Sequence, residues 1–269
     1  MNVGKFEYNR VTKEHHCPIC DGEQWCLISV NNDFVVCPRV SEGSIKRYSF
    51  GYLHKLSDDT VAKLPKRPPP KPKKPFNYFN EIKNATSRVD EDLKPLADVL
   101  GLSIESLKLM DVTYHNKNEP AWGFPMRGAN GEICGIKYRN LQGAKWCASG
   151  SKLGVYVPLN FKAGLCPIYV AEGESDTAAL VMLGYNAIGR PSATTGMAAL
   201  MRYLRPSPEV YIFADTDENN IGLDSSTELR DMLMANAKVV YNPRYKDVRD
   251  WCANDTLTDW AIESHIYHG

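Results

Sequence analysis

The sequence of 269 residues has no excess charge of either sign, because 32 Lys and Arg residues balance 32 Asp and Glu residues. It has no apolar run long enough to cross a bilayer and no apolar signal-peptide stretch near its N-terminus. These absences predict a cytoplasmic protein with no membrane partner. The Gly-Lys-Ser/Thr of a phosphate-binding P-loop is also lacking, which argues against a P-loop ATPase. A zero total charge does not exclude nucleic acid, because local charge governs such binding.

Charge and proline are concentrated in one segment. Residues 63–75 contain six Lys or Arg, six Pro and no acidic residue. Proline at this density prevents helix and central strand, so we expect a semi-rigid spacer over about 62–76. It is either an inert tether or a tether that also contacts phosphates. The spacer would separate a small domain at 12–56 from a larger region, 77–269.

Four of the eight cysteines lie within 21 residues of one another near the N-terminus. Cys17 and Cys20 form a Cys-x2-Cys knuckle, and Cys26 and Cys37 follow. The surrounding domain has too few apolar residues to fold without a bound metal or a crosslink, so the spacing predicts a zinc site on these four thiols. His15 and His16 are alternatives for one ligand. Short strands are expected within 34–40 and 46–53, which gives a zinc ribbon.

The region 77–164 predicts two short helices around Gly101, followed by a β-hairpin. The segments WGFPMR and EICGIKYRNL each show the residue alternation of a strand, and GANGE between them supplies the turn. Lys137 and Arg139 are two residues apart on the second strand, so both side chains face the same side. They form either a solvated face or a surface that binds phosphate.

From residue 165 onward, strands alternate with helices, which predicts an α/β fold with a parallel sheet. A helix at 195–204 is expected to begin at an N-cap on Thr194 or Thr195. A final, mostly helical stretch is expected at 247–266. The expected strands are 166–173, 186–191, 209–215 and 238–243, and the other expected helices are 174–184 and 222–237.

Acidic residues follow three of these strands. Glu172 ends the first, with Glu174 and Asp176 behind it; Asp215 and Asp217 end the third, and Asp247 and Asp250 follow the fourth. Each group alone fits a turn or a helix cap. Together at the carboxyl edge of one sheet they would repel one another unless a cation lies among them. Oxygen ligands favour Mg²⁺ or Mn²⁺, and so phosphoryl transfer.

The loop 189–196, GRPSATTG, leads into a helix. Its backbone N–H groups could hold a phosphate, with Arg190 and Ser192 as the candidate nucleotide or template contacts. The alternative is an ordinary β–α connection.

The motifs EGESD, DTDENNIG and KDVRDW resemble the three acidic motifs of the Toprim domain over about residues 166–252. The resemblance implies that Glu172 acts as general acid/base and that Glu172, Asp215, Asp217 and Asp247 hold Mg²⁺ or Mn²⁺. Asp176 matches a further acidic position of the first motif, so the implied catalytic set is Glu172, Asp176, Asp215 and Asp217. One departure is that residues 218–221, ENNI, precede Gly222 where the family often has an earlier glycine.

A zinc ribbon, a linker and a Toprim domain in this order resemble the primases, both the bacterial type and the primase half of phage primase-helicases. The resemblance implies oligoribonucleotide primer synthesis on single-stranded DNA from nucleoside triphosphates, with a separate replicative helicase as partner. It also implies that Lys137 and Arg139 contact nucleotide or template. The expected setting is phage or mobile-element replication in a bacterial host. The alternatives are a Toprim nuclease and a non-catalytic module that binds single-stranded DNA.

Overall fold

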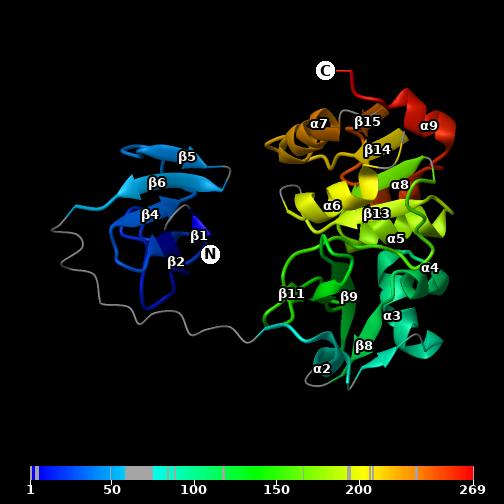
Figure 1. The fold of residues 1–269 in the computed structure, drawn as a ribbon, viewed down its shortest axis with the longest axis horizontal. Helices are drawn as coiled ribbons and strands as arrows, with labels where there is room; N and C mark the ends of the chain where they lie inside the picture. The colour runs from blue at the N-terminus through cyan, green and yellow to red at the C-terminus, as the bar shows by residue number, and fades with distance from the viewer. Residues whose placement is uncertain are drawn as a thin grey trace. The chain divides into compact units, whose positions relative to one another are not determined.

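The structure of the chain, a computed structural model, consists of two compact units, Met1–Pro72 and Lys73–Gly269 (Figure 1). It describes residues 2–3, 6–48, 50–57, 75–83, 85–87, 89–116, 119–165, 167–192, 195–205, 207, 209–233 and 236–268. The predicted 62–76 spacer therefore lies outside the described residues except for its last two positions. Within the described ranges, no helix has both the length and the apolar character that a bilayer span requires.

The first unit is a six-stranded antiparallel sheet with the strand order β1-β2-β3-β4-β6-β5. One face carries a small core in which Ile28 and Val35 pack with Cys17, Cys26 and Cys37. The strand predicted within 34–40 is β4, whereas the segment 46–53 forms two strands, β5 and the start of β6, that pair with each other. Strand β2, before residue 12, joins the sheet by pairing with β3. The strands are β1 Asn2–Val3, β2 Phe6–Arg10, β3 Leu27–Ser29, β4 Phe34–Cys37, β5 Lys46–Tyr48 and β6 Gly51–Lys55.

The second unit begins with a five-stranded antiparallel sheet, ordered β11-β10-β9-β8-β7. The predicted hairpin is confirmed as β9 and β10, and the two predicted helices are α3 and α4. Gly101 ends α3 with a left-handed φ of 67°, which glycine adopts without strain. The elements are α2 Tyr78–Ile82, β7 Thr86–Ser87, α3 Asp90–Leu100, α4 Ile104–Leu109, β8 Thr113–His115, β9 Ala121–Arg127, β10 Ile133–Arg139 and β11 Lys145–Cys147.

The predicted parallel sheet is confirmed, with all of its four strands parallel in the order β13-β12-β14-β15. Two details differ from the sequence expectation. Helix α6 has Gly196 as its N-cap and no side-chain cap, so Thr195 does not cap it, and Thr194 lies outside the described residues. Strand β15 begins at Asn236, where the preceding helix was expected to continue. The elements are β12 Ile168–Glu172, α5 Glu174–Met182, β13 Ala187–Arg190, α6 Met197–Leu204, β14 Glu209–Phe213, α7 Ile221–Leu233, β15 Asn236–Val240, α8 Val248–Asn254 and α9 Asp259–Ser264.

The two sheets of the second unit are joined by a short strap, Val155 and Tyr156. Val155 exchanges two backbone hydrogen bonds with Arg127 at the end of β9, of 2.8 and 2.9 Å. Tyr156 exchanges two more with Gly189 of β13, also of 2.8 and 2.9 Å. One hydrophobic cluster includes residues of α3, the hairpin and the parallel sheet. The strap therefore ties the hairpin to β13, the outermost strand of the parallel sheet.

Candidate active site and metal centre

The four N-terminal cysteines converge as a metal site requires. The Sγ atoms of Cys17, Cys20, Cys26 and Cys37 all lie within 4.8 Å of one another. The Cys20–Cys26 sulfur distance is 3.6 Å and the Cys26–Cys37 distance is 3.9 Å. Zn–S bonds of about 2.3 Å in a tetrahedron separate sulfurs by about 3.8 Å, so the thiols fit zinc.

Neither predicted histidine alternative is part of this group. The ring of His16 is used locally, with Nδ1 at 3.0 Å from Asp21 Oδ1 and Nε2 at 2.9 Å from the Lys13 carbonyl. His15 pairs through its backbone with Thr12. In the described part of the chain, four thiols alone complete the ligand set.

Glu172 and Arg190 lie side by side at the carboxyl ends of β12 and β13. Arg190 Nη2 is 3.7 Å from Glu172 Oε2, which is buried and accepts no hydrogen bond from a described residue. Arg190 is 1% exposed and donates to the hydroxyls of Ser225 and Ser226 in α7. The residue predicted to contact nucleotide thus lies beneath the sheet edge, where it holds Glu172.

Asp215 and Asp176 occupy the same edge, after β14 and in the first turn of α5. Burial raises the pKa of Asp215 to about 8, with Asp176, Glu172 and Asp247 adding to the effect and Arg190 opposing it. Burial and then Asp247 raise the pKa of Asp176 to about 7, although Arg249 lowers it. Besides burial, neighbouring carboxylates contribute to both raised pKa values, and a cation among them would relieve this repulsion.

Asp217 serves the loop that follows β14. Its Oδ1 accepts hydrogen bonds from the backbone N–H groups of Asn219 and Ile221, at 2.9 and 3.0 Å. Its Oδ2 accepts from Gly222 at 2.8 Å, the contact that contributes most to lowering its pKa. Gly222 also approaches Asp215 so closely that a Cβ would lie 2.5 Å from the Asp215 carbonyl oxygen. The four intervening residues therefore still bring this glycine against the acidic strand end.

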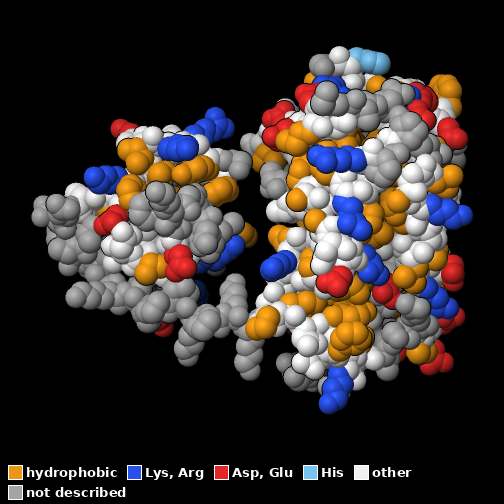
Figure 2. Space-filling view, viewed as in Figure 1, with side chains coloured by type: hydrophobic (Ala, Val, Ile, Leu, Met, Phe, Trp, Pro, Cys, Tyr) orange, Lys and Arg blue, Asp and Glu red, His pale blue; other side chains and the backbone are white. Residues whose placement is uncertain are grey.

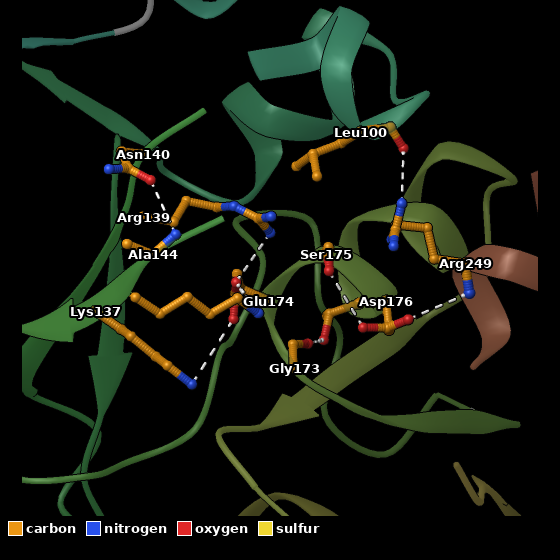
Figure 3. A network of polar contacts seen from close by, with 12 residues as sticks. Leu100, Lys137, Arg139, Asn140, Ala144, Gly173, Glu174, Ser175, Asp176 and Arg249 are labelled. Atoms are coloured by element: carbon orange, nitrogen blue, oxygen red, sulfur yellow. Dashed lines mark hydrogen bonds and ion pairs between the residues drawn. The ribbon is translucent and has the colours of Figure 1, made fainter. Parts of the chain in front are cut away.

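Asp247 caps α8, where its Oδ1 accepts from the backbone N–H of Asp250 at 2.7 Å. The next turn reaches across to α5, since the Arg249 backbone N–H donates to Asp176 Oδ1 at 3.2 Å. Arg249 Nη1 donates to the carbonyl of Leu100 at 3.4 Å, which ties the same turn to α3 (Figure 3). Asp247 is thus held by local geometry close to Asp176.

The carboxylates do not converge as tightly as the thiols. Among the described residues, the four cysteines are the only group of three or more potential ligands within 4.8 Å of one another. The acidic edge nevertheless has the donor set of a Mg²⁺ or Mn²⁺ site. It has several carboxylates, the buried Glu172 Oε2 without a hydrogen bond from the described residues, and pKa values raised by burial and by neighbouring carboxylates. Binding of such an ion by Glu172, Asp215, Asp217 and Asp247 stays a prediction.

A basic strand faces this edge, and its cations contact Glu174. Glu174, at the start of α5, is 1% exposed. Its Oε1 lies 3.1 Å from Arg139 Nη1 and 2.7 Å from Lys145 Nζ, and its Oε2 lies 4.0 Å from Lys137 Nζ. Figure 3 shows β10 projecting Lys137 and Arg139 toward Glu174. Burial alone would raise the pKa of Glu174, but Lys145 and Lys137 outweigh it and the net pKa is lowered.

The predicted loop contacts lie beside this strand. Lys137 Nζ donates to the carbonyl of Pro191 at 3.1 Å, so it spans from β10 to the loop after β13. Ser192 is half-buried and its Oγ is 2.7 Å from Thr195 Oγ1. Residues 193 and 194 of the loop lie outside the described residues. A phosphate-binding role for Ser192 stays a prediction.

Three residues of the site were not predicted. Glu174 and Arg249 stand within the acidic motifs, which predict no separate role for them, and no motif includes Lys145. Lys145 is opposite Arg139 in the β10–β11 ladder, so a strand prediction for 145–147 would have placed it on the same face. The clustering of three cations around Glu174 had no signal in the local sequence.

No protein-family model matches the chain, and no curated protein matches it in sequence. Solved structures do match. The primase fragment of the bacteriophage T7 primase-helicase protein is 15% identical, with a TM-score of 0.52 over 92% of this chain and 96% of that one. The DnaG catalytic core is also 15% identical, with a TM-score of 0.50 over 65% of this chain and 73% of that one. At this identity the likeness concerns the fold alone, and it confirms the predicted architecture: an N-terminal cysteine-rich ribbon, then an antiparallel sheet and a parallel α/β sheet arranged as in these primase structures.

Proposed function

We propose that the chain is a DNA primase of the Toprim type, which joins nucleoside triphosphates into short oligoribonucleotides on single-stranded DNA. The observation that carries the proposal is the acidic edge of the parallel sheet, where burial and mutual repulsion raise the pKa values of Asp176 and Asp215. A divalent ion bound there would neutralise triphosphate charge and activate a 3′-hydroxyl for attack on an α-phosphate.

The chain's own residues would divide the work between two facing elements. Glu172, with a buried oxygen that accepts no hydrogen bond from the described residues, is placed to exchange a proton with the attacking hydroxyl. Lys137, Arg139 and Lys145 present positive charge from the antiparallel sheet toward the same edge. Arg190, buried beneath, keeps Glu172 in place.

The cationic strand favours a polymerising role over a nuclease using the same carboxylates. The strap at 155–156 fixes β9, the hairpin partner of β10, to β13, so a triphosphate could contact carboxylate-bound metal and basic side chains together. The zinc ribbon would contact the template. A replicative helicase, in the same or another chain, would supply single-stranded DNA.

The test is oligoribonucleotide synthesis on single-stranded DNA with Mg²⁺ or Mn²⁺. We expect Glu172→Gln to reduce synthesis at least about 100-fold, and Asp215→Ala to abolish it. The matched controls are Glu228→Gln and Asp98→Asn, which change exposed side chains in α7 and α3.

Full synthesis by Asp215→Ala would overturn the assignment of the site. Metal-dependent cleavage of DNA without nucleotides, and no synthesis, would identify a nuclease instead. Binding to single-stranded DNA with neither reaction would identify a non-catalytic module.

A further inference from the structure

The first unit carries an aromatic and cationic pocket next to the four cysteines. The pocket has a volume of about 400 Å³ and is lined by Arg10, Trp25, Leu27, Pro38, Arg39 and Phe50. None of these six residues is acidic. Trp25 is 65% exposed and Phe50 is 42% exposed. Two rings and two guanidinium groups therefore meet at one open surface.

The groups around the pocket are arranged for stacking. The guanidinium of Arg10 lies 5.7 Å from the centroid of the Trp25 ring. Phe50 is stacked on Tyr48 at 5.4 Å, with an interplanar angle of 4°, and Lys46 Nζ lies 5.2 Å from the Tyr48 centroid. Figure 2 shows Lys and Arg side chains bordering a hydrophobic area where β5 and β6 lie in the view of Figure 1. Aromatic faces beside cations suit unpaired bases and their phosphates.

Trp25 is held in place by the residue that also contacts the thiols. Arg39 Nη1 donates to the carbonyl of Gln24 at 3.0 Å and to the sulfurs of Cys20 and Cys26 at 3.6 and 3.5 Å. Arg39 thus donates to Gln24 and Cys26, the residues on both sides of Trp25. Trp25 itself has a φ of 71°, which is unusual for a non-glycine residue. Gly22 leaves room for the guanidinium, since a Cβ there would lie 2.4 Å from Arg39 Nη1.

From these contacts we infer that Trp25, Phe50 and Arg10 bind an unpaired base of single-stranded DNA by stacking, and that Arg39 makes this pocket depend on the metal. When the four cysteines hold an ion, Cys20 and Cys26 are fixed as thiolates and accept the Arg39 N–H groups more strongly than thiols do. Arg39 then fixes the backbone that displays Trp25. The choice of single-stranded DNA, rather than another single-stranded polynucleotide, rests on the proposed function.

The test uses the full zinc-loaded chain and a fluorescein-labelled single-stranded oligodeoxynucleotide of about 16 nucleotides, with binding followed by anisotropy. We expect Trp25→Ala to weaken binding about tenfold without changing the zinc content, and Trp25→Phe to retain most of the affinity. The matched control is Trp260→Ala, which removes a 79% exposed tryptophan from α9. Wild-type affinity in Trp25→Ala, or an equal loss in Trp260→Ala, would overturn the stacking site.

The link to the metal has its own readout. Arg39→Ala and Gly22→Ala should both speed the loss of zinc to a chelator, measured with a metallochromic dye, and both should weaken binding of the oligonucleotide. Gly22→Ala displaces the guanidinium without removing a side chain that lines the pocket. Unchanged zinc release and unchanged DNA affinity in both variants would overturn the role of Arg39.

The binding assay contains no nucleotides and does not depend on catalysis. If the wild-type chain makes no oligoribonucleotide while Trp25→Ala still weakens binding, the proposed function fails and the stacking site stands. If synthesis is normal and Trp25→Ala binds like wild type, only the stacking site fails. Tighter binding of a matched oligoribonucleotide than of the oligodeoxynucleotide would overturn the assignment of DNA as the ligand.

Discussion

Glu174 Oε1 accepts a hydrogen bond from Arg139 Nη1 at 3.1 Å, and both side chains are buried between β10 and α5. Lys145 and Lys137 approach the same carboxylate, so one buried acid is shared by three cations. This arrangement joins the basic face of the hairpin to the first turn after β12, and it determines what removing either partner does.

Replacing the buried acid should destabilise the second unit. Glu174→Gln leaves Arg139 and Lys145 without a counter-charge, and we expect a loss of about 3 kcal/mol in the free energy of unfolding. Urea titration followed by circular dichroism measures it. Glu228→Gln, an exposed change on α7, should stay within about 0.5 kcal/mol of wild type. Equal stability of the two variants would contradict a central role for Glu174.

The stabilising effect of a divalent ion should grow with pH. The folded-state pKa values of Asp215 and Asp176 are raised to about 8 and about 7. Stability contributed by such raised groups is present at low pH and is lost as pH rises through the folded pKa. Mn²⁺ or Mg²⁺ binds the deprotonated form and should restore that stability. The increase in Tm on adding the ion should therefore be larger at about pH 9 than at about pH 6, measured by differential scanning fluorimetry. An equal shift at both values would contradict binding at these carboxylates.

Two substitutions of Asp217 separate its loop role from a metal role. Asp217→Ala removes the acceptor of three backbone N–H groups and should cost about 2 kcal/mol of stability, whereas Asp217→Asn keeps Oδ1 and should cost about 1 kcal/mol. Thermal unfolding gives both values. If Asp217 also binds metal, Asp217→Asn loses primer synthesis while it stays folded. Synthesis at the wild-type rate in Asp217→Asn would confine the residue to the loop.

Removing zinc should unfold the first unit alone. Its core is small and includes three of the four cysteines, while the second unit has its own larger cluster. Cys26→Ser should reduce bound zinc and expose the first unit to proteolysis, leaving unfolding of Lys73–Gly269 unchanged. Cys147→Ser, which changes an exposed thiol on β11, is the control. Normal zinc content in Cys26→Ser would contradict its role as a ligand.

Periodicity and strand ends were sufficient to predict the parallel sheet and its acidic edge. Those signals are local: an apolar run predicts a strand, and carboxylates after several parallel strands must meet at one edge. Motif spacing did not predict where Gly222 lies. Although Gly222 comes later in the sequence than the glycine of the Toprim motif, it still packs against Asp215. Strand β2 was not predicted, because its sequence FEYNR contains no aliphatic residue and is too short for its alternation to indicate a strand.

Arg190 and Glu174 show what the sequence could not reveal. An arginine in a loop motif such as Arg190 is expected at the surface. Instead it is buried and donates hydrogen bonds to two hydroxyls of α7, which lie 35 and 36 residues further along the chain. Glu174 receives its three cations from β10 and β11, and only the packing of one sheet against the other brings them together. Burial of charge depends on partners distant in sequence, so neither outcome follows from residue type.

The strap at Val155 and Tyr156 has a consequence for how the second unit can be divided. It supplies two hydrogen bonds to Arg127 at the end of β9 and two to Gly189 of β13, so it links the two sheets directly. A fragment that starts at residue 165 would lack the two hydrogen bonds at Gly189, so more of the edge strand β13 would be left unpaired. The hairpin and the parallel sheet are therefore expected to fold as one cooperative unit.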